Sequence, residues 1–127
     1  MSNNLLVLAG RILLALIFII SGYGKLTGLS GTAGYFGSIG LPLPMVTAVL
    51  VGVLELFGGL AVAVGYQTRI AAILLALFTV GSGFVAHFDF ADQMQSIQFM
   101  KNLSMTGGFL VLAGFGAGKL SIDGRKG

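Results

Sequence analysis

Four long apolar stretches dominate the chain, and each is about the length that an α-helix needs to cross the ~30 Å hydrocarbon core of a bilayer. The core of a bilayer contains no water that could hydrogen-bond with backbone N–H and C=O groups. Segments of this kind therefore cross it as helices, in which these groups bond to one another. The sequence therefore predicts an all-α fold, an integral membrane four-helix bundle that forms a single domain over residues 1–127. The expected spans are residues 5–23, 45–64, 70–88 and 99–117.

The composition fits a membrane protein and excludes several kinds of chemistry. Hydrophobic residues make up 56% of the 127 residues and charged residues only 9%, with a mean hydropathy of +0.99, which leaves no room for a separate soluble catalytic domain. Cysteine is absent, so disulfides, thiolate-bound metals and cysteine nucleophiles are excluded. The net charge of +3 is too small for a nucleic-acid-binding surface, and the expected partner is the lipid bilayer.

Charged residues near the ends of the stretches predict the orientation, because Lys and Arg collect on the cytoplasmic side of a membrane. Four spans put both termini on one side, and most of the positive charge falls there, so we expect both termini in the cytoplasm. The first stretch is interrupted by Arg11 and has no basic start, which distinguishes it from a signal peptide. The charges expected inside are Arg69, Lys119, Arg125 and Lys126, and those expected outside are Lys25, Asp89, Asp92 and Lys101.

Glu55 lies in the middle of the second stretch, where an unpaired carboxylate costs at least ~2.5–3.5 kcal/mol. The helical rise places Glu55 ~13 Å from the inner end of its stretch and Arg11 ~9 Å from the inner end of the first stretch. The sequence therefore predicts an Arg11–Glu55 ion pair, in which the guanidinium binds both carboxylate oxygens. Such a pair is either a functional polar layer or a device that fixes helix registry, and lipid headgroups are a competing partner for Arg11.

A second polar group is expected at the outer ends of the helices. His87 is the only histidine, so bis-histidine haem ligation and a multi-histidine metal site are excluded within one chain, and neither metal nor haem is expected. An imidazole beside ammonium and amide donors suits the binding of a carbonyl or phenol oxygen, and ordinary snorkelling at the interface is the alternative. The expected members are Tyr23, Lys25, His87, Lys101 and Asn102.

The connections carry further signals. Residues 25–44 are rich in glycine and end at Pro42 and Pro44, which is typical of an interfacial segment that lies on the outer surface. Residues 65–69 form a tight turn, which makes the second and third helices antiparallel neighbours. Residues 118–127 are expected to be a charged, flexible end. Glycines inside the spans are expected to let the helices pack closely.

Taken in order along the chain, these motifs resemble the DoxX family of small membrane proteins, which is related to the membrane subunit of thiosulfate:quinone oxidoreductase. The resemblance covers nearly the whole length, and the ordered set of motifs is specific although no single motif is. The motifs are Arg11, Gly22-Tyr23-Gly24-Lys25-Leu26, Gly40-Leu41-Pro42, Glu55 followed by Gly58-Gly59, Gly65 with Thr68-Arg69, His87, Lys101-Asn102 and Leu120-Ser121-Ile122-Asp123. The family positions that carry over are Arg11, Lys25, Glu55, Arg69, His87, Asn102 and Asp123.

The resemblance implies a protein of the bacterial cytoplasmic membrane that is linked to quinone-coupled oxidation and oxidative stress. The leading hypothesis is a membrane subunit of a quinone- or quinol-linked oxidoreductase, with a quinone as the bound carrier that supplies the electron chemistry. A soluble or membrane oxidoreductase would be its partner. The residues expected to be catalytic are His87, Glu55 and Arg11, and those expected to bind the ring are Tyr23, Lys25, Lys101 and Asn102.

Two other classes of function stay open. A small transporter would use Glu55 as a proton-coupled site, and it would work as a homo-oligomer because four short helices enclose little space. An ion pair between Glu55 and Arg11 weighs against that reading, because a paired carboxylate exchanges protons less readily. A non-catalytic membrane anchor or assembly factor would bind no ligand, and Glu55→Gln would then change stability only.

Overall fold

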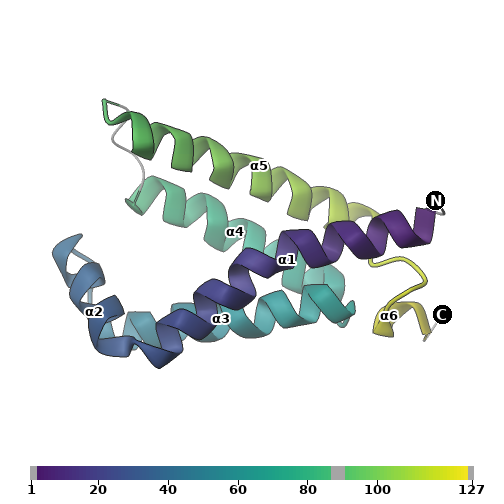
Figure 1. Ribbon diagram of the computed structural model, residues 1–127, viewed down its shortest axis with the longest axis horizontal. Coiled ribbons are helices and arrows are strands. Elements are labelled where there is room, and N and C mark those ends of the chain that lie inside the picture. Colours follow the sequence, from purple (N-terminus) through teal and green to yellow (C-terminus); the bar gives the residue numbers. More distant parts are fainter. Residues whose placement is uncertain (1–2, 87–90, 126–127) are drawn as a thin grey trace.

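The computed structural model describes residues 3–86 and 91–125, and its regular structure over these ranges is entirely helical. Four helices are long, and two short helices follow the first and the last of them (Figure 1). The N-terminal end of α1 and the short α6 lie at one end of the molecule, and α2 lies at the other. The helices are α1 (Asn3–Thr27), α2 (Leu29–Ser38), α3 (Pro44–Val64), α4 (Thr68–Ala86), α5 (Gln93–Phe115) and α6 (Ile122–Arg125).

Three of the described helices are long and apolar enough to cross a membrane, namely α1, α3 and α4 as far as Val85. The expected all-helical fold is therefore confirmed for the described part of the chain. α5 is long enough, at 23 residues, but its first half is rich in glutamine and serine and includes Lys101 and Asn102. Its crossing of the membrane, and with it the count of four spans, stays a prediction.

The start of α5 differs from the expectation. The helix begins at Gln93, and Asp92 precedes it with an extended backbone. Asp92 Oδ1 accepts a hydrogen bond from the Met94 N–H at 2.9 Å, which is the geometry of an N-cap. Because this cap starts the helix before the apolar stretch begins, α5 begins six residues before the expected span at residues 99–117. The expected end of the preceding span, at residue 88, lies outside the described residues.

Glycines set the distance and the register between α1 and α3. A Cβ on Gly22 would press on the backbone nitrogen of Leu56, and a Cβ on Gly59 would meet Ile19 Cγ1 at 2.9 Å. The two backbones are therefore in direct contact, which favours association in lipid because packing replaces the hydrophobic effect there. These contacts fix an antiparallel register, in which Gly22 lies opposite Leu56 and Ile19 lies opposite Gly59.

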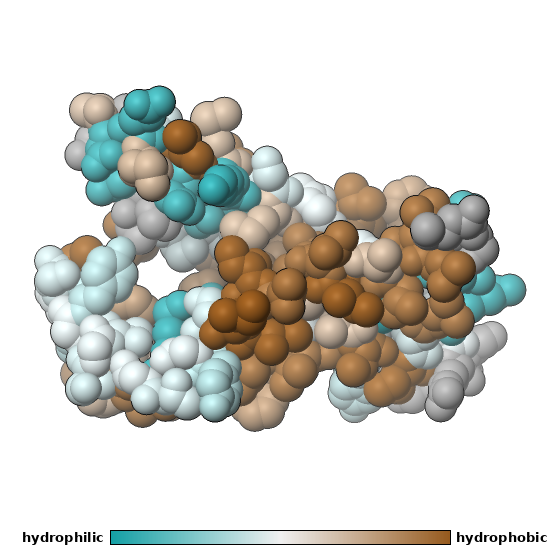
Figure 2. All heavy atoms as spheres, in the orientation of Figure 1, coloured by the Kyte–Doolittle hydropathy of each residue, from teal (hydrophilic) through white to brown (hydrophobic). Residues whose placement is uncertain are grey.

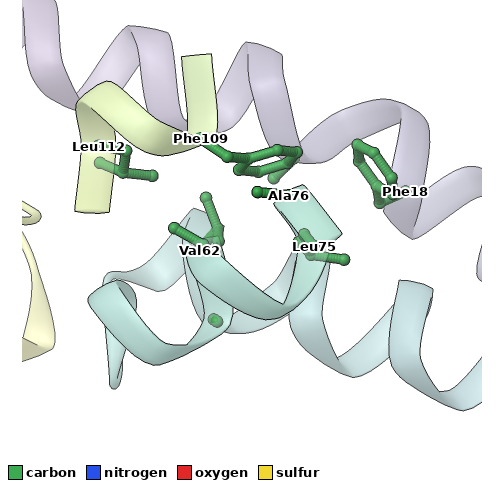
Figure 3. Packing of buried hydrophobic residues seen from close by; sticks show 9 residues of the cluster. Phe18, Val62, Leu75, Ala76, Phe109 and Leu112 are labelled. Atoms are coloured by element: carbon green, nitrogen blue, oxygen red, sulfur yellow. The ribbon is translucent and has the colours of Figure 1, made fainter. Parts of the chain in front are cut away.

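The apolar core lies toward the end that holds the chain termini. Phe18 of α1 and Phe109 of α5 meet edge to face with their ring centroids 5.3 Å apart, a geometry worth about 0.5–1.5 kcal/mol beyond the area it buries. Figure 3 shows Val62 of α3 and Leu75 of α4 packed in the same cluster. The cluster thus joins all four long helices; its members are Ala15, Phe18, Val62, Ala71, Ala72, Leu75, Ala76, Phe109 and Leu112.

Beyond this core the α1–α3 pair and the α4–α5 pair diverge toward the end that holds α2 (Figure 1). The segment expected to be interfacial, residues 25–44, contains the helix α2, which packs mainly on α3. Gly40 follows with a φ of 82°, a value that glycine adopts without strain, and Pro44 begins α3. Figure 2 shows a hollow between α2 and the nearby end of α5.

Substitution of Gly22 tests the contact that sets the register. Gly22→Ala should lower the free energy of unfolding by about 1–3 kcal/mol, the usual cost of overpacking, because the new methyl group would press on α3 backbone atoms that cannot move alone. Gly24→Ala is the matched control, since a Cβ there meets no atom within 4 Å. Reversible unfolding in mixed micelles, followed by circular dichroism, measures both. Equal stability of the two variants would contradict the proposed contact.

Candidate functional site

A cavity of about 1130 Å³ lies between the diverging helix pairs. Its size is sufficient for a ring-sized ligand with part of a tail, and its mainly apolar lining with a few polar groups is typical of small-molecule sites. α1 and α3 form one wall, α4 and α5 form the opposite wall, and α2 contributes Tyr35 and Phe36. The polar side chains on the two main walls are Ser21, Lys25, Thr47, Glu55, Thr79, Ser82, Gln98, Lys101, Asn102 and Ser104.

Lys25 and Glu55 form an ion pair on the α1–α3 wall. Lys25 Nζ lies 2.7 Å from Glu55 Oε1, and the two side chains are 23% and 7% exposed. The Ser21 hydroxyl joins both groups, because it accepts a hydrogen bond from Lys25 Nζ at 2.7 Å and donates one to Glu55 Oε1 at 3.4 Å. The carboxylate in the middle of α3 therefore has a cation and a hydroxyl beside it.

The predicted Arg11–Glu55 ion pair is wrong. Gly22 lies opposite Leu56 in the register of α1 and α3, so Glu55 meets Ser21 rather than Arg11. Arg11 precedes Ser21 by ten residues, which is ~15 Å along the helix axis. The estimate made from the ends of the apolar stretches misplaced the two charges, because the glycine contacts and not those ends decide which residues face each other.

Arg11 instead joins the start of the chain to two other segments. Its Nη1 donates to the carbonyls of Val62 at 3.4 Å and Ala63 at 3.3 Å, and its Nη2 donates to the carbonyl of Leu120. The last carbonyls of α3 have no partner inside the helix, and a cation there also offsets the partial negative charge of the helix end. Arg11 is 2% exposed, and it lies away from the cavity.

The C-terminal segment caps the start of α4. Asp123 accepts hydrogen bonds from the backbone N–H groups of Gln67 at 2.9 Å and Thr68 at 2.8 Å, and its own N–H donates to the carbonyl of Gly65 at 2.7 Å. A carboxylate in this position accepts hydrogen bonds from N–H groups that have no partner inside the helix. Its negative charge also interacts favourably with the positive end of the helix dipole. The expectation of a flexible end at residues 118–127 is therefore wrong for its described part.

Asn102 lies on the opposite wall of the cavity, and it connects α5 to α4. Its Nδ2 donates to the carbonyl of Thr79 at 3.0 Å and lies 3.4 Å from Ser82 Oγ. The residue is 9% exposed. Lys101 is exposed and also lines the cavity. The structure thus brings Lys25, Lys101, Asn102 and Glu55 to one cavity, from both helix pairs.

The structure does not place two other residues proposed from the sequence at the cavity, and the reason differs between them. Tyr23 is 64% exposed and does not line the cavity. His87 falls outside the described residues, so its position beside Lys101 and Asn102 stays a prediction. Sequence reasoning missed Ser21, although a signal was present, because residues four apart on a helix face the same side and Ser21 precedes Lys25 by four.

The two walls have different chemistry. The α1–α3 wall offers an ammonium group that can donate to a ligand oxygen, next to a carboxylate that can accept a hydrogen bond. The α4–α5 wall offers amide and hydroxyl groups together with the ammonium group of Lys101. In a mainly apolar cavity, polar groups placed in this way would orient a flat ligand that has oxygen atoms on its edge.

Removal of one charge at a time tests the ion pair. Lys25→Met should cost about 3–5 kcal/mol of stability, because it leaves the buried Glu55 carboxylate without its cation. Glu55→Gln should cost less, since Lys25 is more exposed and can turn toward a wetter region. The double variant K25M/E55Q should regain most of the loss. Unfolding in mixed micelles measures all three, and purely additive costs would contradict a direct pair.

Removal of the Asp123 carboxylate tests the capping of α4. Asp123→Ala should cost about 1 kcal/mol, which corresponds to about fivefold more of the released C-terminal segment. Trypsin cleavage after Lys119 should then become faster by the same factor. Asp92→Ala is the control, because it removes an N-cap that bonds locally to Met94 and should leave this cleavage rate unchanged. An unchanged rate in Asp123→Ala would show that the cap does not hold the segment.

Comparison with known proteins identifies one matching family and several similar proteins. The DoxX family profile matches residues 6–88. The inner membrane protein YqjF of Escherichia coli (strain K12) is 45% identical over 117 residues, which cover 92% of this chain and 88% of the relative. The inner membrane protein YphA of the same organism is 37% identical over 129 residues, covering 98% and 92%.

A third relative carries a functional name. The Bacillus subtilis (strain 168) protein named "Putative oxidoreductase CatD" is 42% identical over 72 residues, which cover 57% of this chain and 52% of that protein. No solved structure matches the chain significantly. The family match, the long alignments with two inner membrane proteins and the three membrane-capable helices lead to one conclusion: the chain belongs to the DoxX family and is a multi-pass protein of the bacterial inner membrane.

Proposed function

We propose that the protein is a membrane subunit of a quinone-linked oxidoreductase system and that the cavity holds the ring of the quinone. The observation that carries this proposal is the Lys25–Glu55 pair, a charged group in the wall of an otherwise largely apolar cavity. A pair that served only to connect α1 and α3 would not need to border a cavity. A lipid-soluble ring with polar oxygens matches both the apolar lining and the charged group.

The residues of the α1–α3 wall fit the expected chemistry. Lys25 would donate a hydrogen bond to a ring oxygen and stabilise negative charge that develops on it. Glu55 would accept a hydrogen bond from a hydroxyl group of the ring, and Ser21 would keep both groups in position. The quinone, when bound, supplies the electron chemistry. Relationship to CatD supports an oxidoreductase role over the part of the chain that the two proteins share.

The proposal includes a fourth membrane span and cytoplasmic termini. The polar residues that lower the hydropathy of α5 include Gln98, Lys101 and Asn102, all of which line the cavity. Polar groups in a membrane helix are tolerated when they face the interior of a bundle, so α5 can cross the bilayer in spite of them. An electron-donating or electron-accepting partner would then meet the bundle at one membrane surface.

A proton-coupled transporter is less well supported. Glu55 would have to separate from Lys25 before it could bind a transported ion, and the two atoms are 2.7 Å apart. An assembly factor without a ligand would leave the cavity without a role. The oxidoreductase reading therefore accounts for more of the observed geometry.

Purification in mild detergent, followed by mass spectrometry of the extracted lipids, tests the proposed function. The wild-type protein should carry a quinone in near-stoichiometric amount. The K25M/E55Q variant, in which neither charge is left unpaired, should lose most of it. Tyr23→Phe is the control, because Tyr23 lies outside the cavity, and it should keep the quinone. His87→Ala is expected to lose it if this side chain reaches the ring, as the sequence predicts.

Two results would argue against a quinone site. One is a wild-type protein that neither retains a quinone nor takes one up when short-chain quinone is added. The other is a K25M/E55Q variant that binds quinone as well as the wild type does.

A further inference from the structure

The orientation of the Asn102 side chain is fixed by its neighbours on α4. The carbonyl of Thr79 has only lone pairs to offer, and Asn102 faces it at 3.0 Å. Ser82 Oγ donates its single hydrogen to the same carbonyl at 3.0 Å, so Ser82 also presents lone pairs to Asn102, at 3.4 Å. Both neighbours therefore require the NH₂ group of the amide to point toward α4.

The amide oxygen of Asn102 is consequently the group left for a ligand. Among the described residues, Asn102 Oδ1 has no hydrogen-bonding partner, and the residue lines the cavity. A reversed amide would set Oδ1 against the Thr79 carbonyl and lose the 3.0 Å hydrogen bond, so the side chain cannot offer its NH₂ group to the ligand without a cost. The sequence suggested that Asn102 would be a donor to a ring oxygen, and the geometry makes it an acceptor.

The opposite wall can also accept a hydrogen bond. Glu55 Oε1 forms the ion pair with Lys25 and accepts the hydrogen bond from Ser21. Glu55 Oε2 has no hydrogen bond within the described part of the chain. Glu55 thus has a carboxylate oxygen left for a hydroxyl donor. The ammonium groups of Lys25 and Lys101, one on each wall, can donate to a ligand oxygen of either kind and so favour neither form. The cavity therefore presents acceptors on both walls, one from α3 and one from α5.

We infer that the cavity binds the reduced, dihydroxy form of its ring ligand more tightly than the oxidised, dicarbonyl form, and that Asn102 is a residue that determines this preference. The inference rests on the proposed function, because it concerns the same cavity and the same class of ligand. A hydroquinone carries two O–H donors, one for Asn102 Oδ1 and one for Glu55. A quinone carries only acceptors, so its oxygen would face the Asn102 oxygen with no hydrogen between them.

The size of the preference follows from the hydrogen bond that changes. A hydrogen bond gained by the reduced form and lost by the oxidised form should alter the ratio of the two dissociation constants by about three- to tenfold. For a two-electron couple, a tenfold preference for the reduced form raises the midpoint potential of the bound ligand by about 30 mV. The site would thus favour arrival of electrons on the ring over their departure.

Binding of tetramethyl-1,4-benzoquinone and of its hydroquinone to the protein in lipid nanodiscs tests the inference. The fully substituted ring cannot react with lysine, and anaerobic conditions keep the hydroquinone reduced. Equilibrium dialysis gives the two dissociation constants, and empty nanodiscs correct for partition into lipid. The wild-type protein should bind the hydroquinone about three- to tenfold more tightly. Asn102→Ala should bring the ratio of the two constants close to one.

Thr106→Val is the matched control. Thr106 lies one turn further along α5, its hydroxyl bonds to the Asn102 carbonyl at 2.8 Å, and it does not line the cavity. This variant should keep the wild-type ratio. If Asn102→Ala fails to assemble, Asn102→Thr replaces it, because a hydroxyl group both donates and accepts and should also abolish the preference.

The outcomes separate this inference from the proposed function. Binding of both forms with equal affinity, or tighter binding of the quinone, would overturn the preference while leaving a quinone site in place. An Asn102 variant that keeps the wild-type ratio would overturn the role of Asn102. Binding of neither form above the level of empty nanodiscs would overturn both the proposed function and this inference.

Discussion

The backbone contact between α1 and α3 is the constraint on which the arrangement of charges depends. Gly22 and Gly59 allow no side chain between the helices, so the register cannot slide without a collision. Once this register is set, Glu55 can meet only the end of α1, where Lys25 and Ser21 lie, and Arg11 can reach only the last turn of α3. Two buried charges that look like partners in the sequence are thereby separated, Glu55 beside the cavity and Arg11 at the junction with the C-terminal segment.

Much of the architecture could be predicted from the sequence, because apolar stretches of membrane-spanning length have few alternatives to a helix. The tight turn at residues 65–69 also identified α3 and α4 as neighbours, and the two helices are in contact. The polar residues of the cavity were only partly predictable. Lys25, Glu55 and Asn102 stood out as polar groups near apolar helices, but the pairing of Glu55 depended on a register that residue depth alone does not determine. Ser21 carried a local signal, its spacing of four from Lys25, whereas the contact of Ser82 with Asn102 depends on how α4 packs on α5.

The C-terminal segment shows why hydrogen bonding of helix ends was hard to foresee. A helix leaves carbonyls free in its last turn and N–H groups free in its first turn. The turn between α3 and α4 joins the last turn of one helix to the first turn of the next, so both kinds of group meet there. Arg11 from the start of the chain and Asp123 from its end supply the missing partners. A sequence pattern reveals a cap that lies next to its helix, as Asp92 does for α5, but not one that arrives from 55 residues away. Arg11 and Asp123 are therefore better understood as structural residues, although both belong to the set of positions that resemble the DoxX family.

The same fold that holds the termini together opens at the other end. The apolar core and the capped turn concentrate packing where α1, α3, α4 and α5 all meet, and beyond that point the two pairs of helices separate. Each pair has its own internal polar connection, Lys25 to Glu55 within α1–α3 and Asn102 to Thr79 within α4–α5. Because each connection is satisfied within its own pair, the walls need no bond across the cavity to remain stable. A carboxylate oxygen on one wall and an amide oxygen on the other have no partner among the described residues, and a ligand that bridges the walls could bind both. Because such a ligand would contact both helix pairs, its binding should stabilise the folded bundle as a whole.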